Sequence, residues 1–179
     1  MSTPARRATV VVDLGFGDAG KGTLVDWLTR SQGVSLVVRW NGGAQAGHNV
    51  VLDDGRHHTF SQLGAGTFVP GVRTHLSEDV VVHPTALLLE ARVLADKGVT
   101  DALARLSIAQ SARVISPFHQ AANRLRETAR GDDRHGTCGV GVGEAVRDAL
   151  EHPVDALRMH HVVGDRSALR TLLRRVQER

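Results

Sequence analysis

The sequence predicts an α/β fold, a mostly parallel, doubly wound sheet with a phosphate-binding turn that is similar to a P-loop. Short apolar runs typical of strands alternate with helical segments along the whole chain. A turn broken by glycines joins the first expected strand to the first expected helix. Because no repeat, low-complexity tract or linker interrupts this alternation, we expect residues 1–179 to form a single nucleotide-binding domain.

The composition excludes several classes of protein. Hydrophobic residues make up 41 % of the chain and charged residues 23 %, as in ordinary globular proteins. Aromatic residues reach only 3 %, so we expect a core of valine, leucine and alanine. The net charge is a mild +3, and the arginine-rich end "RSALRTLLRRVQER" has no aromatic residue for base stacking. That end therefore favours a solvated helix face over a nucleic-acid surface.

The cysteine count and the hydropathy pattern bear on location. The single cysteine, Cys138, excludes an internal disulfide and fits a reducing compartment. No apolar stretch is long enough to span a bilayer, and no secretory signal is visible. We therefore expect a cytoplasmic protein that binds neither a membrane nor nucleic acid.

The first elements in order form a strand–loop–helix–strand unit. Val10–Leu14 is apolar on both faces, as expected of a central parallel strand. Lys21–Arg30 follows as a helix, and Val34–Asn41 as a second strand. A right-handed crossover would place both strands in one parallel sheet.

A hairpin, a strand and a helix come next. The triplet "DDG" between "NVVL" and "HHTFSQL" is typical of a hairpin turn. Asp79–His83 is a short apolar strand, after which Pro84 begins a helix that runs to about Lys97, with Gly98 as its stop.

The rest of the chain repeats the alternation. The stretch "ARLSIAQ" is a further strand candidate. The next helix has Ser116 as its cap, Pro117 in its first turn and Gly131 after its end. A second glycine-rich loop, "HGTCGVGVGEAV", leads into a short helix.

The loop Gly15–Thr23, "GFGDAGKGT", predicts a phosphate site. Its four glycines let backbone N–H groups turn inward, and the helix amino terminus that follows favours an anion. Lys21 adds a positive charge, and Thr23 offers a hydroxyl that could face a metal ion. The loop nearly matches the P-loop pattern, except that Gly22 separates Lys21 from Thr23.

Asp18 lies inside this loop and needs an explanation. A carboxylate beside a triphosphate is repelled unless Mg²⁺ lies between them or the carboxylate takes a proton from a substrate. Both roles require a second substrate next to the phosphate. The alternative is a turn-forming aspartate that faces solvent.

The stretch "RWNGGAQAGHNV" supplies a second candidate cluster. Gln45 lies between two glycine turns, and Gly47 allows a backbone carbonyl to approach a cation. His48 follows the second expected strand, at the sheet edge where α/β proteins bind ligands. A lone histidine is more often a structural residue, but this one lies on the loop that faces the phosphate loop.

With these stretches the chain resembles the amino-terminal portion of the adenylosuccinate synthetase (IMP–aspartate ligase) family. That family has a G-D-E-G-K-G-K loop, a G-G-x-N-A-G-H segment and a G-T-T-G-R-G-I-G-P loop. They correspond here to Gly17–Thr23, Gly42–His48 and Gly136–Gly143. The motifs occur in the family's order, and the first two in combination are specific.

The resemblance implies a two-step ligation. Asp18 would remove the N1 proton of IMP and coordinate Mg²⁺, and the IMP 6-oxygen would attack the γ-phosphate of GTP. His48 would stabilise the charge that forms there. The amino group of L-aspartate would then displace phosphate from the activated carbon, so that one difficult substitution becomes two easier steps.

The resemblance also assigns the remaining site residues. The catalytic residues would be Asp18 and His48. The phosphate-binding residues would be Gly17, Asp18, Ala19, Gly20, Lys21, Gly22, Thr23, Gly47, His48 and Asn49. IMP would contact Asp18, Lys21, Gln45, Ala46, Gly47, His48 and Cys138. The Mg²⁺ ligands would be Asp18 and Gly47.

The chain departs from the family pattern at several of these positions. Ala19 replaces a glutamate, Thr23 a lysine, Gln45 an asparagine, Cys138 a threonine and Val140 an arginine. Gln45 keeps the amide, whereas a thiol is a poor hydrogen-bond replacement for a hydroxyl. The family arginine that reaches the neighbouring subunit has no counterpart in register, since Arg147 is displaced.

The family's guanine-recognition residues and its aspartate-binding loop lie in later sequence, and nothing after Val163 resembles them. We therefore expect weak GTP binding with little base selectivity, and no complete ligation by this chain alone. The chain would be a fragment, a divergent short relative or one piece of a split enzyme. It would act as a homodimer or paired with a longer relative.

Three alternatives remain open from the sequence. A nucleoside-monophosphate kinase shares the loop pattern G-x-x-x-A-G-K-G-T, but it has no place for "GGAQAGH". A non-catalytic nucleotide-binding or partner subunit is the second alternative. The third is a branch of the family that acts on dGMP in place of IMP, although Asp18 as a candidate base favours IMP.

Overall fold

The computed structural model describes residues 7–15 and 19–179. Its elements, in chain order, are α1 (Lys21–Gln32), β1 (Leu36–Gly43), β2 (His48–Val51), β3 (His57–Phe60), β4 (Arg73–Val82), α2 (Pro84–Asp96), β5 (Leu106–Ile108), β6 (Arg113–Val114), α3 (Pro117–Ala129), the 3₁₀ turn η1 (Gly131–Asp133), α4 (Val142–Glu151), α5 (Met159–Val163) and α6 (Arg166–Glu178). Within these residues no helix is long and apolar enough to cross a membrane.

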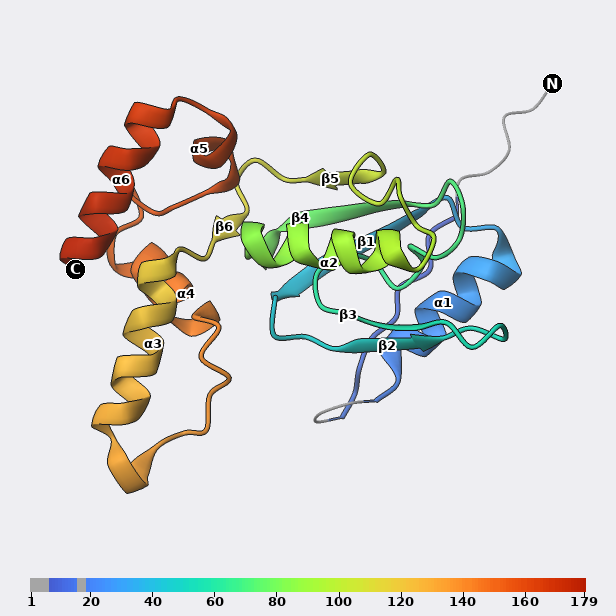
Figure 1. Ribbon diagram of the computed structural model, residues 1–179, viewed down its shortest axis with the longest axis horizontal. Helices are drawn as coiled ribbons and strands as arrows, with labels where there is room; N and C mark the ends of the chain where they lie inside the picture. Colours follow the sequence, from blue (N-terminus) through green and yellow to red (C-terminus); the bar gives the residue numbers. More distant parts are fainter. Residues whose placement is uncertain (1–6, 16–18) are drawn as a thin grey trace.

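The sheet is parallel and centred on β4, which confirms the predicted α/β class. Strand β1 pairs along one side of β4, and β5 and β6 pair one after the other along its opposite side. Strands β2 and β3 form a separate antiparallel hairpin. Figure 1 shows α2 lying across the sheet, while α3, α4, α5 and α6 gather beyond the end of β4.

Most of the expected helices and strands are present. The hairpin turns at Gly55, whose φ of 85° requires glycine. Helix α2 begins at Pro84 as expected, with the His83 side chain as its cap. Helix α3 has the predicted Ser116 cap, which forms a capping box with His119. The strand expected at Asp79–His83 is longer, because β4 already begins at Arg73.

The expected central strand Val10–Leu14 was wrong, since residues 7–15 belong to no strand. The side chains of Val10, Val12 and Leu14 are 81 %, 67 % and 97 % exposed. An apolar run forms a central strand only where neighbours bury both of its faces. The described residues bury β1 on one face only, which leaves Trp40 67 % exposed.

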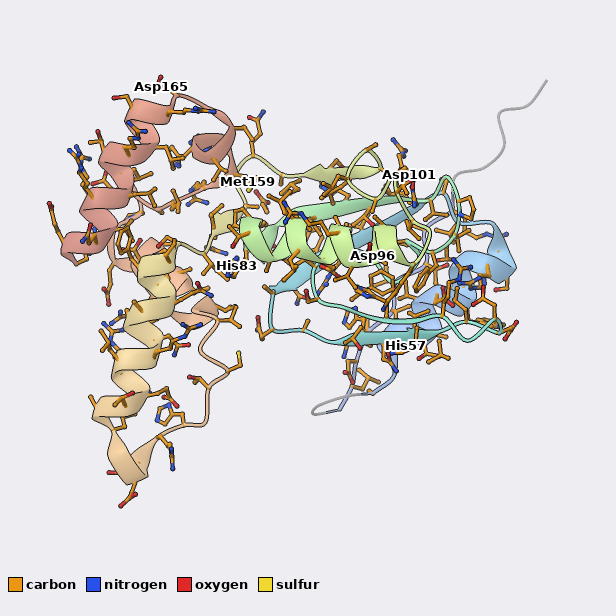
Figure 2. The ribbon with its side chains drawn as sticks, in the orientation of Figure 1. His57, His83, Asp96, Asp101, Met159 and Asp165 are labelled. Carbon is orange, nitrogen blue, oxygen red and sulfur yellow. The ribbon has the colours of Figure 1, made fainter. Side chains whose placement is uncertain are left out.

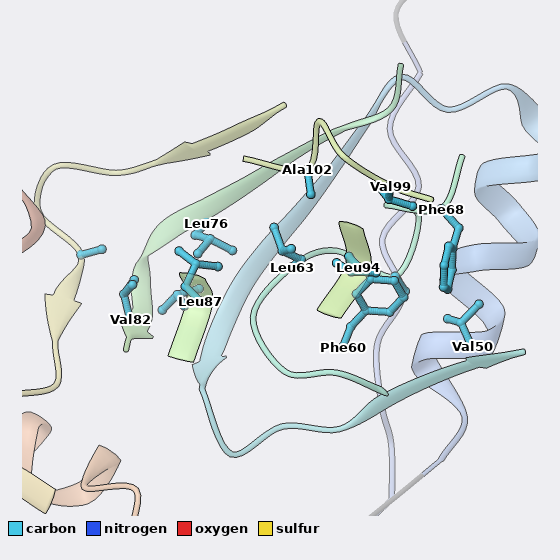
Figure 3. Close-up of a cluster of buried hydrophobic side chains, with 13 residues drawn as sticks. Val50, Phe60, Leu63, Phe68, Leu76, Val82, Leu87, Leu94, Val99 and Ala102 are labelled. Atoms are coloured by element: carbon cyan, nitrogen blue, oxygen red, sulfur yellow. The ribbon is translucent and has the colours of Figure 1, made fainter. Parts of the chain in front are cut away.

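The main core lies between the sheet, α2 and the hairpin (Figure 3). Its fully buried members include Phe60, Leu63, Leu76 and Leu94. As expected, most of the cluster is valine, leucine and alanine. The exceptions are Phe60 and Phe68, whose rings meet edge to face with centroids 5.5 Å apart.

A buried carboxylate, Glu90 of α2, ties this core together. It accepts backbone N–H groups from Ser61 at 2.8 Å, Gln62 at 2.9 Å and Leu63 at 3.3 Å, just after β3. The His58 ring also lies 3.5 Å from the carboxylate. Burial alone would raise the pKa of Glu90, but the nearby His58 ring and the hydrogen bonds from these N–H groups hold it below its usual range.

We predict that Glu90→Gln lowers the free energy of unfolding by about 2–4 kcal/mol, because the buried N–H groups lose a charged acceptor. Since folding lowers the pKa of Glu90, its ionised carboxylate stabilises the protein above about pH 4.5. That stabilisation is lost as the pH falls through the pKa of Glu90 in the folded protein. Urea unfolding at pH 7 and at pH 3 measures both effects. The control Asp54→Asn removes a surface ion pair with Arg56, and should leave stability nearly unchanged because solvent screens that pair. Equal effects of the two variants would contradict the role of Glu90.

Candidate functional site

The amino end of α1 has the geometry of an anion-binding helix start. Gly20 caps the helix in the left-handed region, with φ of 73°, and Lys21 is the first helical residue. Gly17 and Asp18 lie outside the described residues. The convergence of Asp18 with His48 therefore stays a prediction. Ala19 is exposed beside the cap.

The first and second motifs meet at the contact between Gly22 and His48. A Cβ atom built on Gly22 would lie 2.6 Å from the Cβ of His48 and 2.8 Å from its Cα. No side chain fits there, so glycine lets the first turn of α1 rest on the start of β2. The structure thus places His48 beside the end of the predicted phosphate loop.

Hydrogen bonds tie the same two segments together. The Thr23 hydroxyl donates to the Asn49 carbonyl at 3.2 Å, so this predicted metal-facing group links α1 to β2. The Asn49 side chain in turn accepts from Thr59 of β3 at 3.3 Å. Gly47 also packs on Thr59, with 3.2 Å from a built Cβ to its methyl group. The hairpin therefore supports the segment that carries His48.

Lys21 contacts a residue that the sequence motifs did not single out. Its ammonium group forms an ion pair with the Asp13 carboxylate. Asp13 also accepts the Gly15 N–H at 3.0 Å. The hydrogen bond from Lys21, then the one from Gly15, lowers the pKa of Asp13. The sequence did contain a signal for Asp13, because a carboxylate is unusual inside the otherwise apolar run "VVVDL".

A second part of the site is a hollow of about 550 Å³ beyond the end of β1. It brings together Gln45 and Cys138, which come from the second and third motifs. Its full lining is Gln45, Asn123, Arg130, His135, Thr137, Cys138, Gly141, Val142, Gly143 and Glu144. The predicted IMP residue Ala46 lies in the turn after β1, where its N–H donates to the Gly43 carbonyl at 3.1 Å.

Two close backbone approaches form this hollow. A Cβ atom on Gly43 would lie 2.7 Å from the Gln45 amide oxygen and 2.9 Å from a methyl of Val142. One on Gly141 would lie 2.9 Å from the backbone nitrogen of Gln120 in α3. These contacts hold the third motif against both β1 and α3, above a small apolar cluster around Val81, Ile115 and Ala145.

Part of the lining was missed by sequence reasoning. The Asn123 amide donates to the Thr137 hydroxyl at 3.0 Å, and the Thr137 N–H donates to Glu127 at 3.0 Å. Those bonds fix the third motif on α3. Asn123 and Arg130 are seven residues apart and so share one helix face, which is the signal that could have found them.

Charged groups around the hollow are paired. Glu144 contacts both Arg126 and Arg147, so the displaced arginine noted in the sequence has a partner within its own helix. His83 lies at the start of α2, at the junction between the sheet and the second group of helices (Figure 2). Its ring contacts the Gln120 amide at 2.9 Å, and burial lowers its pKa.

The predicted metal ligands can be judged by their donor atoms. Among the described residues, no three histidine, cysteine, aspartate or glutamate side chains gather closely enough to hold a metal ion. The predicted pair is the Asp18 carboxylate, outside those residues, and the Gly47 carbonyl. Carboxylate and carbonyl oxygens are the ligands that Mg²⁺ prefers, so this donor set fits in kind.

We predict that Gly22→Ala destabilises the protein by about 1–3 kcal/mol, because the new methyl group collides with His48. Thermal unfolding measures the loss. Gly143→Ala is the matched control, since nothing lies within 4 Å of its built Cβ in α4. It should be neutral or stabilise by up to about 1 kcal/mol. A Gly22→Ala variant as stable as the parent would contradict the close approach of α1 to β2.

Comparisons with known proteins give the family to which the chain is similar. The sequence model of the family described as adenylosuccinate synthetase matches residues 10–179. A curated adenylosuccinate synthetase of Chlorobium chlorochromatii is 39 % identical over 147 residues, which are 82 % of this chain and 33 % of that protein.

Two solved structures have a similar fold. The fully ligated adenylosuccinate synthetase from Plasmodium falciparum matches with a TM-score of 0.78 at 22 % identity, over 90 % of this chain and 36 % of that one. The succinoaminodeoxyadenylate synthetase of cyanophage S-2L, bound to dGMP and dATP, matches with a TM-score of 0.52 at 26 % identity, over 91 % of this chain and 47 % of that one.

Proposed function

This chain belongs to the adenylosuccinate synthetase family, and from that premise we propose that it serves the GTP-dependent ligation of IMP and L-aspartate to adenylosuccinate. The chain spans about a third of the length of the curated relatives it matches. Its proposed share of the reaction is the activation of IMP by phosphoryl transfer.

The observation that carries the proposal is the position of the segment Gly42–His48. At one end His48 touches Gly22 in the first turn of α1. In the middle of the segment, Gln45 lines the hollow that is also lined by Cys138. One short segment thus borders both a candidate phosphate site and a cavity large enough for a nucleotide base. A transfer between two substrates needs that adjacency.

Each residue has a proposed task in the first step. Lys21 and the backbone N–H groups at the start of α1 hold the phosphates of GTP. Asp18 takes the N1 proton of IMP, so that the 6-oxygen can attack the γ-phosphorus while the bond to the GDP oxygen breaks. His48 donates to the oxygens on which charge accumulates. Mg²⁺, held by Asp18 and the Gly47 carbonyl, would supply charge neutralisation on the phosphates.

The second step replaces phosphate by nitrogen. The amino group of L-aspartate attacks the activated carbon, the C–O bond breaks, and inorganic phosphate leaves. We propose that Gln45 and Cys138 hold IMP in place during both steps. The assembly we propose is a homodimer or a pair with a longer relative, in the cytoplasm.

We predict that the chain binds GTP and IMP separately, and that Lys21→Met weakens GTP binding roughly 10- to 100-fold because a charged phosphate contact is lost. Isothermal titration calorimetry at fixed salt measures the affinities. Arg170→Met, an exposed cation of α6, is the matched control and should bind GTP like the parent. Equal losses in both variants would argue against a specific phosphate loop.

We predict further that Gln45→Ala weakens IMP binding by roughly 10-fold and leaves GTP binding unchanged, since the lost amide lies in the hollow. Gln110→Ala is its control, because that glutamine engages α5 through its backbone carbonyl. If neither nucleotide binds the parent chain, the non-catalytic partner role replaces the ligase proposal. Phosphate transfer from ATP to AMP or GMP without aspartate would favour the kinase instead.

A second candidate acceptor is dGMP. The similarity to the cyanophage enzyme, whose structure contains dGMP, favours testing it. Titrating dGMP and IMP against the same preparation separates the two cases, and tighter binding of dGMP would reassign the acceptor.

A further inference from the structure

We propose that Asp13 is an internal counter-ion of the phosphate loop, which occupies Lys21 in the nucleotide-free chain and which an incoming phosphate must displace. The inference rests on the proposed phosphate site, and it adds a residue that lowers the affinity of that site for phosphate. The observation behind it is the Asp13–Lys21 ion pair, together with the hydrogen bond from Gly15 to the same carboxylate.

The surroundings of the Asp13 carboxylate are those of a bound anion. It takes one lysine ammonium and one backbone N–H from the beginning of the glycine loop. Phosphates at such loops are held by the same two kinds of donor. The Asp13 side chain is 17 % exposed and that of Lys21 34 %, so the pair is partly withdrawn from solvent. Asp13 therefore uses the donors that a nucleotide phosphate needs.

Electrostatic repulsion sets the response of this pair to an incoming phosphate. A phosphate bound by Lys21 would lie within a few ångströms of the carboxylate, where like charges repel. The ion pair must therefore open before the ligand can take its place. This lowers the affinity of the loop below that of the same loop with a neutral residue at position 13. We expect the difference to be roughly 3- to 10-fold at moderate salt, because screening weakens a partly exposed pair.

The test compares Asp13→Asn with a control that matches it in chemistry. Asp54 also accepts the N–H two residues ahead, at 3.0 Å, and also pairs with a basic side chain, Arg56, but on the hairpin turn. Asp54→Asn therefore removes the same charge from a similar local structure. The probe is inorganic tripolyphosphate, titrated by calorimetry at about 0.1 M ionic strength. Asp13→Ser serves as a second neutral variant, and circular dichroism verifies that each variant is folded.

We expect Asp13→Asn and Asp13→Ser to bind tripolyphosphate roughly 3- to 10-fold more tightly than the parent, and Asp54→Asn to bind like the parent. The gain should be clearly smaller when Asp13→Asn is introduced into Lys21→Met, because Asp13 and the phosphate then have no lysine to compete for and only the repulsion between carboxylate and phosphate is relieved. Binding by Asp13→Asn that is equal to or weaker than the parent's would overturn the inference and leave the phosphate site standing. An equal gain in Asp54→Asn would overturn it as well, as a general charge effect. No binding by any variant would overturn both the site and the inference.

Discussion

The contact of backbone on backbone between Gly22 and His48 is the constraint on which the candidate site depends. It brings the first turn of α1 against the start of β2, and the hydrogen bond from Thr23 to Asn49 holds the two together. The start of α1, the hairpin and the end of β1 are thereby brought together. Any side chain at position 22 would separate the predicted phosphate loop from the segment that borders the hollow.

The elements with strong local signals could be predicted from the sequence. The capped helices α2 and α3 and the hairpin turn at Gly55 depend on residues that favour them wherever they occur. The strand expected at Val10–Leu14 depends on neighbours instead. An apolar run indicates burial but does not show which element buries it. Within the described residues only one face of β1 is buried.

The sequence motifs indicate which segments line the candidate site, but not which contacts join those segments. Gln45 and Cys138 were both expected to contact IMP, and both line the same hollow in the fold. The spacing of Asn123 and Arg130 places them on one face of a helix, but only the packing of α3 beside the third motif turns that face toward the hollow. The pairing of Asp13 with Lys21 is a contact between residues eight positions apart that the motif itself does not specify.

The partly covered sheet has a consequence for the behaviour of the protein in solution. Within the described residues β1 is an edge strand, and Trp40 on it is exposed. An open edge of this kind accepts hydrogen bonds from any extended polypeptide, including another copy of itself. Self-association through this edge should therefore increase with protein concentration.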